Sequence, residues 1–234
     1  MSDVVYFCRD GQNEELRYSL RSVERNFPHD RVIIYGGKPD GITPDIFEPI
    51  DQHEKTRWHN VRAMIEACCK NDNISEDFWL FNDDFFVMQK IDELKPQYNG
   101  TLWQHIKEIE ARISGFSNYT NQLRSLCHTI TTWQFENELL NYAVHMPMLI
   151  NRKKALETLA KFPDEPMFRA LYGNHHHIGG ENTPDCKFGT ILEPKTMATR
   201  FLSTSDEAFI GADVGEYIRA RFTEPSRWEN GREL

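Results

Sequence analysis

The sequence predicts an α/β protein in which a mostly parallel β-sheet is flanked by helices. Strand-like segments alternate with helix-like segments from residue 4 to residue 88, which is the order that a parallel sheet requires. The strand-like segments are rich in β-branched and aromatic residues, whereas the helix-like segments repeat apolar residues every three or four positions. In such sheets ligands bind beyond the carboxyl ends of the strands, so we expect the functional residues to lie there.

The first two strands and the helix between them have clear sequence boundaries. A β-branched and aromatic run at residues 4–7 predicts the first strand. A helix is expected from Asn13, an N-cap residue type, to Phe27, because apolar residues recur on one face and Pro28 follows. Residues 31–35 predict the second strand. The two glycines after it allow a tight turn, but they do not form a P-loop because the Gly-Lys-Ser/Thr ending is absent.

The rest of the first half leads to an acidic motif. Residues 47–50 predict a short edge strand, and residues 55–70 predict a helix. The stretch 78–88 reads FWLFNDDFFVM, in which Asp83 and Asp84 stand between two apolar runs. Buried neighbouring carboxylates either take up protons or are neutralised by a cation, so we expect a divalent metal ion here. The alternative is that Asn-Asp-Asp forms the turn of a β-hairpin.

The second half of the sequence is less regular. Apolar spacing predicts three helices, at residues 102–113, 152–162 and 214–222. Residues 114–121 are polar enough for a loop that acts as a lid. A strand is expected at 142–150, where Pro147 indicates a sheet edge, and a last strand at 201–206 ends in a carboxylate. The three adjacent histidines within 172–180 cannot all face one metal ion, so a solvated loop is expected there.

Composition narrows the class of protein. The 234 residues suit a single globular domain, and the net charge of -9 disfavours broad binding to nucleic acid, which relies on Lys and Arg. The five cysteines contain no C-x-x-C pair, so neither a structural zinc site nor a disulfide framework is indicated. No apolar run reaches the ~20 residues of a membrane-spanning helix, and no signal peptide is visible, so we expect a cytoplasmic protein without a membrane span.

Segments along most of the chain resemble conserved regions of one protein family. Residues 3–6, 9–22 and 81–86 resemble the first conserved regions of the Stealth proteins, and His145-Met146-Pro147, 201–206 and 225–229 are similar to the third and fourth. Stealth proteins are nucleotide-sugar-dependent transferases that include bacterial capsular polysaccharide phosphotransferases. Because this chain is short and its first two motifs are fused, it is equally similar to a minimal GT-A glycosyltransferase of the kind found in phage and bacterial genomes.

Both resemblances imply the same architecture. The chain would form a single GT-A-like domain over residues 1–234, with a Rossmann-type, mostly parallel sheet. Residues 1–95 would be its nucleotide-binding half, and residues 96–234 would be a smaller, irregular acceptor-side half. In GT-A-like proteins an acidic pair at a strand end holds Mn²⁺ or Mg²⁺, and the metal binds the diphosphate of a sugar nucleotide.

The resemblances also imply roles for individual residues. The metal ligands would be Asp83 and Asp84, with His145 as a third ligand. The nucleotide sugar would be bound by Arg9, Asp10, Arg17, Gly36, Asn82 and Asp83. Arg9 and Arg17 suit phosphate, because arginine makes bidentate contacts and Arg17 lies in the first turn of a helix. Asp206 or Asp185 would be the general base if the anomeric centre inverts, and His145 is a further candidate for catalysis.

Three functions follow from these expectations. The first is a metal-dependent glycosyltransferase that moves a sugar from a nucleotide-sugar donor, with UDP as the expected nucleotide, to an acceptor glycan or another hydroxyl compound. The second is a sugar-1-phosphate transferase of the Stealth kind, which forms a phosphodiester. The third is a sugar-binding module without catalytic activity. A hydroxymethylated DNA base is an expected acceptor if the chain comes from a virus.

Overall fold

A computed structural model describes residues 1–9, 11, 13–37, 40–54, 56–112, 117–132, 139–189 and 199–230. Its centre is a five-stranded sheet with the strand order β3-β2-β1-β4-β7. These strands are β1 (Asp3–Cys8), β2 (Val32–Gly36), β3 (Ile46–Pro49), β4 (Asp77–Asn82) and β7 (Met148–Asn151). The first four are parallel to their neighbours, and β7 runs antiparallel to β4 at one edge. The predicted α/β class with a mostly parallel sheet is therefore confirmed.

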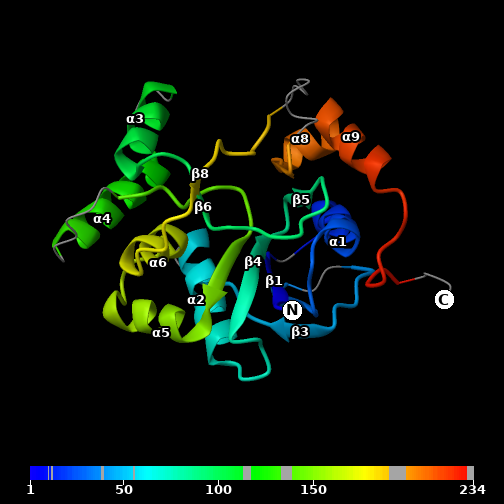
Figure 1. Ribbon diagram of the computed structural model, residues 1–234, viewed down its shortest axis with the longest axis horizontal. Helices are drawn as coiled ribbons and strands as arrows, with labels where there is room; N and C mark the ends of the chain where they lie inside the picture. The colour runs from blue at the N-terminus through cyan, green and yellow to red at the C-terminus, as the bar shows by residue number, and fades with distance from the viewer. Residues whose placement is uncertain are drawn as a thin grey trace.

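Helices cover both faces of the sheet, as Figure 1 shows. Helix α1 (Glu14–Asn26) packs against one face, where Val4, Tyr6 and Cys8 of β1 point. Helices α2 (Arg57–Lys70), α5 (Arg152–Lys161) and α6 (Phe168–His175) pack against the other face, where Val5 and Phe7 point. Successive strand residues face opposite sides, so a strand that is apolar at every position must be covered on both faces.

Local capping residues set where the helices begin. The Asn13 side chain accepts a hydrogen bond from Leu16 N at 2.9 Å, and α1 ends at Asn26, two residues before Pro28. Thr56 caps α2 in the same way by accepting from His59 N. These side chains satisfy backbone N–H groups that have no partner within the helix. The predicted first helix and its N-cap are confirmed.

The acidic motif lies between two strands that pair with different partner strands. Asp83 and Asp84 form a turn that connects β4 to β5 (Phe85–Val87). Strand β5 pairs antiparallel with β9 (Phe201–Ser203) and not with β4. The motif is therefore a turn, as the hairpin alternative expected, but the strands on its two sides belong to different sheets. The chain leaves the main sheet at the carboxyl end of β4, which brings both carboxylates to that edge.

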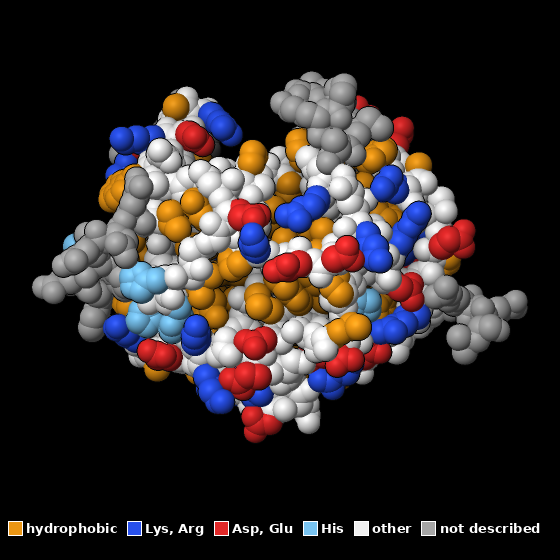
Figure 2. Space-filling model, viewed as in Figure 1, with side chains coloured by type: hydrophobic (Ala, Val, Ile, Leu, Met, Phe, Trp, Pro, Cys, Tyr) orange, Lys and Arg blue, Asp and Glu red, His pale blue; other side chains and the backbone are white. Residues whose placement is uncertain are grey.

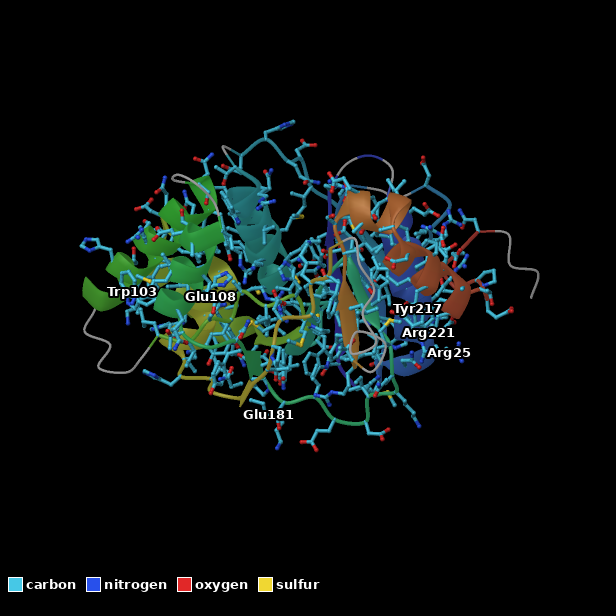
Figure 3. The ribbon with its side chains drawn as sticks, turned by 90° about the horizontal axis from the view of Figure 1, so that it is seen from above. Arg25, Trp103, Glu108, Glu181, Tyr217 and Arg221 are labelled. Carbon is cyan, nitrogen blue, oxygen red and sulfur yellow. The ribbon has the colours of Figure 1, made fainter. Side chains whose placement is uncertain are left out.

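The second half adds two pairs of helices at opposite ends of the molecule. Helices α3 (Leu102–Arg112) and α4 (Asn118–Thr132) form one pair, and α8 (Asp206–Gly211) and α9 (Asp213–Arg221) form the other (Figure 1). Figure 3 shows Tyr217 and Arg221 of α9 beside Arg25 of α1, far from Trp103 and Glu108 of α3. A short ladder of β6 (Gln97–Tyr98) and β8 (Glu181–Asn182) lies between the pairs. The second half also supplies β7 to the main sheet, so the chain on either side of residue 95 shares one core.

Three sequence predictions in the second half are wrong. Asn118–Asn121 was expected within a polar lid loop, but it begins α4, whose buried stripe of Leu123, Leu126, Cys127 and Ile130 outweighs the polar start. The histidine stretch was expected to be a loop throughout, but α6 continues through His175, which packs edge-on against Phe162, so only residues 176–180 are irregular as expected. The strand expected from residue 142 begins only at Met148, because only the part after Pro147 pairs with β4.

The surface is mixed in character. Figure 2 shows hydrophobic side chains across the middle of one face, with acidic and basic side chains between and around them. Within the described part of the chain, no helix is both long enough and apolar enough to cross a membrane.

Candidate active site

The candidate site lies where β1 and β4 end, at the carboxyl edge of the sheet. Asp83 follows β4 directly, and its Oδ2 accepts a hydrogen bond from Asn13 Nδ2 at the start of α1. Burial raises the pKa of Asp83 to about 6, and the neighbouring charge of Asp84 adds to this effect. The Asn13 side chain thus caps α1 through its oxygen and binds Asp83 through its nitrogen, which ties the acidic turn to the helix.

Asp84 is held by residues from the strand that pairs with β5 and from the segment before it. Its Oδ2 accepts a hydrogen bond from Ser203 Oγ at 2.8 Å and lies 3.1 Å from Lys187 Nζ. Its side chain is 14% exposed, whereas that of Lys187 is 37% exposed. The cationic side chain of Lys187 therefore already faces this carboxylate.

Two further carboxylates surround the acidic turn. Glu15, in the first turn of α1, is only 7% exposed, and its Oε1 accepts from Thr204 Oγ1 at 2.6 Å. Burial, together with the charges of Asp84 and Asp83, raises the pKa of Glu15 to about 8. Asp206 begins α8 and forms an ion pair with Arg9, which follows β1. The Arg9 hydrogen bond holds the pKa of Asp206 below its ordinary value.

The structure brings together two of the predicted catalytic residues, His145 and Asp185. His145 Nδ1 lies 2.7 Å from Asp185 Oδ2, and the backbone N–H of His145 donates to Asp185 Oδ1 at 2.9 Å. Burial acts to raise the pKa of Asp185, but the hydrogen bonds from His145 outweigh it, so the net pKa is lowered. Because Nδ1 is bound to a carboxylate, the other ring nitrogen of His145 is available to accept a proton.

The predicted metal ligands are only partly brought together. Within the described ranges, no three His, Cys, Asp or Glu side chains lie close enough to hold a metal ion. Asp83 and Asp84 remain as an adjacent pair, whereas His145 is hydrogen-bonded to Asp185. The role of His145 as a third ligand therefore stays a prediction.

The other predicted nucleotide-binding residues have different surroundings. Gly36 ends β2 with a φ of +104°, and a Cβ there would lie 2.2 Å from Cys8 O, so this position requires glycine. Asn82 ends β4 opposite Phe7 of β1. Arg17 Nη1 donates to Glu229 Oε2 at 3.1 Å, which ties it to the C-terminal segment. Asp10 lies outside the described residues.

Sequence reasoning missed Glu15, Lys187 and Arg169, all of which lie near the acidic turn. Glu15 has the local pattern of an ordinary acidic residue in the first turn of a helix, where such residues are common. Its hydrogen-bond partner Thr204 is 189 positions away in the chain. No local sequence signal marks contacts of this range.

Comparisons with known proteins give a fold likeness only. No family model and no curated protein sequence matches the chain. Among solved structures, the galactosyltransferase LgtC in complex with donor and acceptor sugar analogues is similar at 11% identity and a TM-score of 0.45, covering 96% of this chain and 98% of that one. An active-site mutant of LgtC is similar at 12% identity and a TM-score of 0.46, with the same coverage. A likeness of this degree assigns neither a substrate nor a site residue to this chain.

Proposed function

We propose that the chain is a metal-dependent glycosyltransferase that moves a sugar from a nucleotide-sugar donor, most simply a UDP-sugar, to an acceptor hydroxyl. The observation that carries the proposal is the position of Asp83 and Asp84 at the carboxyl end of a central parallel strand. This edge is where α/β sheets bind nucleotides, and two adjacent carboxylates there are suited to a divalent cation.

The acidic pair fits Mn²⁺ or Mg²⁺ because it needs a positive partner. The pKa of Asp83 rises to about 6 through burial and the charge of Asp84, so the pair is unfavourable as a bare dianion. Such ions are commonly held by one or two carboxylates together with the phosphate oxygens of the substrate, so a third protein ligand is not needed. When bound, the ion would act as a Lewis acid that stabilises negative charge on the leaving nucleoside diphosphate.

Basic residues near Asp84 and Asp206 would hold the donor phosphates. Lys187 now pairs with Asp84 and Arg9 with Asp206. If a divalent ion replaced the Lys187 ammonium at Asp84, the ammonium would become available to a phosphate oxygen of the donor. Arg9, whose side chain is 57% exposed, can turn to the same ligand.

The acceptor is activated by His145 with Asp185. Asp185 orients the imidazole and stabilises its protonated form, so His145 can take the proton from the acceptor hydroxyl. The acceptor oxygen then bonds to the anomeric carbon while the bond from that carbon to the diphosphate oxygen breaks, and the nucleoside diphosphate leaves with the bonding electrons. Asp206 is a weaker candidate for the base, because it is half exposed and paired with Arg9.

Thermal unfolding in the presence of sugar nucleotides tests this proposal. A ligand that binds only the folded state raises the unfolding temperature, so a donor should stabilise the protein with Mn²⁺ and much less without it. The mass of the product then distinguishes a glycoside from a phosphodiester, which carries an additional phosphate. Stabilisation without turnover of any acceptor would instead indicate a sugar-binding module. If no sugar nucleotide stabilises the protein under either condition, the glycosyltransferase proposal is wrong.

A further inference from the structure

Arg169 lies between the acidic pair and the His145–Asp185 pair. It is the second residue of α6, and its guanidinium carbon lies 5.6 Å from the ring centroid of Phe85, which follows Asp84 in the chain. Its Nη2 donates to the backbone oxygen of Met146, the residue after His145. Both halves of the candidate site therefore meet at this one side chain.

The guanidinium of Arg169 is short of hydrogen-bond partners. Its Nε is buried and has no partner in the described part of the chain, where the bond to Met146 O is the only one made by the side chain. An arginine has five N–H donors, and a buried donor without a partner costs about 1–3 kcal/mol. The pKa of Arg169 falls to about 10 because of burial, although the charges of Asp185 and Asp84 oppose the fall.

Other partly buried arginines of this chain have partners that account for their position. Arg62 on α2 donates from Nη1 to Glu165 O at 3.0 Å and from Nη2 to Leu159 O at 2.9 Å. Arg21 binds both carboxylate oxygens of Glu229 at 2.7 Å. Those arginines bridge elements of the fold. Arg169 instead keeps a buried Nε donor without a partner in the described part of the chain, beside the candidate site, which is a cost in stability that a ligand would remove.

We propose that Arg169 binds an oxyanion of the substrate, a phosphate group, at a position between Asp84 and His145. An arginine suits this ligand because two of its N–H groups can bind two oxygens of one phosphate. The inference deepens the proposed glycosyltransferase function and rests on it for the source of the phosphate. That source is either the diphosphate of the donor, which would leave as negative charge develops on it, or a phosphate carried by the acceptor.

Arg169→Gln, with Arg169→Lys as a second variant, tests the proposal by isothermal titration in Mn²⁺ with inorganic pyrophosphate, UDP, uridine and a hexose 6-phosphate. We expect pyrophosphate and UDP to bind at least about 10-fold more weakly to Arg169→Gln, and the lysine variant to recover part of this loss. Uridine, which has no phosphate, should not distinguish the variants. Without phosphate compounds, Arg169→Gln should unfold at the wild-type temperature or above it, because the variant removes a buried donor that has no partner in the described part of the chain.

Arg62→Gln is the matched control, because it removes an arginine whose donors are used within the fold. It should lower the unfolding temperature and leave pyrophosphate affinity unchanged. A loss of affinity in Arg169→Gln for the hexose 6-phosphate alone would support the phosphate site and assign it to the acceptor. Unchanged affinity for all phosphate compounds in both variants at position 169 would overturn the inference, as would a wild-type protein that binds none of them.

The same experiment separates this inference from the proposed function. If wild-type protein turns over a sugar nucleotide and Arg169→Gln binds every phosphate compound normally, the inference is wrong and the glycosyltransferase function stands. If pyrophosphate binding depends on Arg169 but no sugar nucleotide is turned over, the phosphate site stands and the glycosyltransferase function does not.

Discussion

Glu229 and Glu15 are two buried glutamates, 5% and 7% exposed, with opposite surroundings. Glu229 accepts hydrogen bonds from Arg21, Arg17 and the backbone N–H of Ser226, so its charge is neutralised in place. Burial acts to raise the pKa of Glu229, but its partners outweigh it, so the net pKa is lowered.

Glu15 has a hydroxyl partner in Thr204, and the charges that act on it come mainly from other carboxylates. Its pKa rises to about 8. Equal burial thus produces a structural ion pair at one place and, at the other, a carboxyl group that is held neutral at pH 7. This carboxyl lies beside the acidic pair, where we propose that a cation and a phosphate bind. Buried carboxyl groups with strongly raised pKa values are concentrated at functional sites, so Glu15 favours a role in ligand binding.

The largest expected effect is on turnover of the sugar nucleotide when Asp84 loses its charge. Asp84→Asn keeps the shape of the side chain and its contact with Ser203, but it removes one of the two adjacent negative charges. We expect turnover of the sugar nucleotide to fall about 10³-fold and stabilisation by Mn²⁺ with donor to be lost, because the charge is needed to hold the ion. Asp72→Asn, a change at a fully exposed carboxylate, is the control and should behave as wild type. Equal turnover in Asp84→Asn and wild type would contradict the proposal that Asp84 holds a metal ion for the reaction.

The second prediction concerns the fully partnered glutamate. Glu229→Ala leaves Arg21, whose side chain is 11% exposed, without its carboxylate partner. We expect the free energy of unfolding to fall by about 3–5 kcal/mol, as measured by urea denaturation. Glu66→Gln breaks the exposed pair with Lys70 and should cost no more than about 0.5 kcal/mol. A loss below about 1 kcal/mol for Glu229→Ala would show that the buried ion pair with Arg21 contributes little to stability.

The two glutamates should also have opposite pH dependence. The pKa of Glu15 is raised from 4.5 to about 8, so the folded state holds its proton more tightly and its contribution to stability is lost as the pH rises from about 4.5 to 8. Glu15→Gln should therefore gain roughly 3 kcal/mol over wild type on going from pH 5 to pH 8 without metal. The pKa of Glu229 is lowered, so its stabilisation is present above pH 4.5 and lost as the pH falls. Urea denaturation across this pH range measures how the stabilities of Glu15→Gln and Glu229→Ala change relative to wild type. If both differences changed in the same direction with pH, the comparison of the two glutamates would be contradicted.

The smallest effect is expected at Lys187, where a cation already faces Asp84. Because this partly exposed pair contributes up to about 1 kcal/mol, Lys187→Met should raise the affinity for Mn²⁺ by up to about 5-fold in a direct titration without donor. Lys90→Met is the control, because Lys90 is 80% exposed and pairs with the exposed Asp92. Weaker Mn²⁺ binding in Lys187→Met would mean that the ammonium does not compete with the ion for Asp84.

Features that depend on neighbours in the chain were predicted well. The run from Phe78 to Asn82 forms a buried parallel strand, and Asn13 caps the first helix, because periodicity and capping are properties of a few consecutive residues. The two acidic residues also lie at the strand end as expected. The loops expected at residues 118–121 and 172–175 are helical instead, because the buried faces of α4 and α6 come from packing that local polarity does not reveal.

The sequence by itself determined the α/β class and the position of Asp83 and Asp84 after a central strand. That the cysteines form no zinc or disulfide framework is an expectation from the sequence. Only the tertiary structure decided which distant groups meet at that strand end. Asp185 pairs with His145 across 40 positions, and Thr204 reaches Glu15 across 189. Only the fold also leaves the buried Nε of Arg169 without a partner among the described residues. The physical reason is that helix and strand patterns reflect short-range geometry, whereas burial and electrostatic balance depend on how the strands are ordered in the sheet.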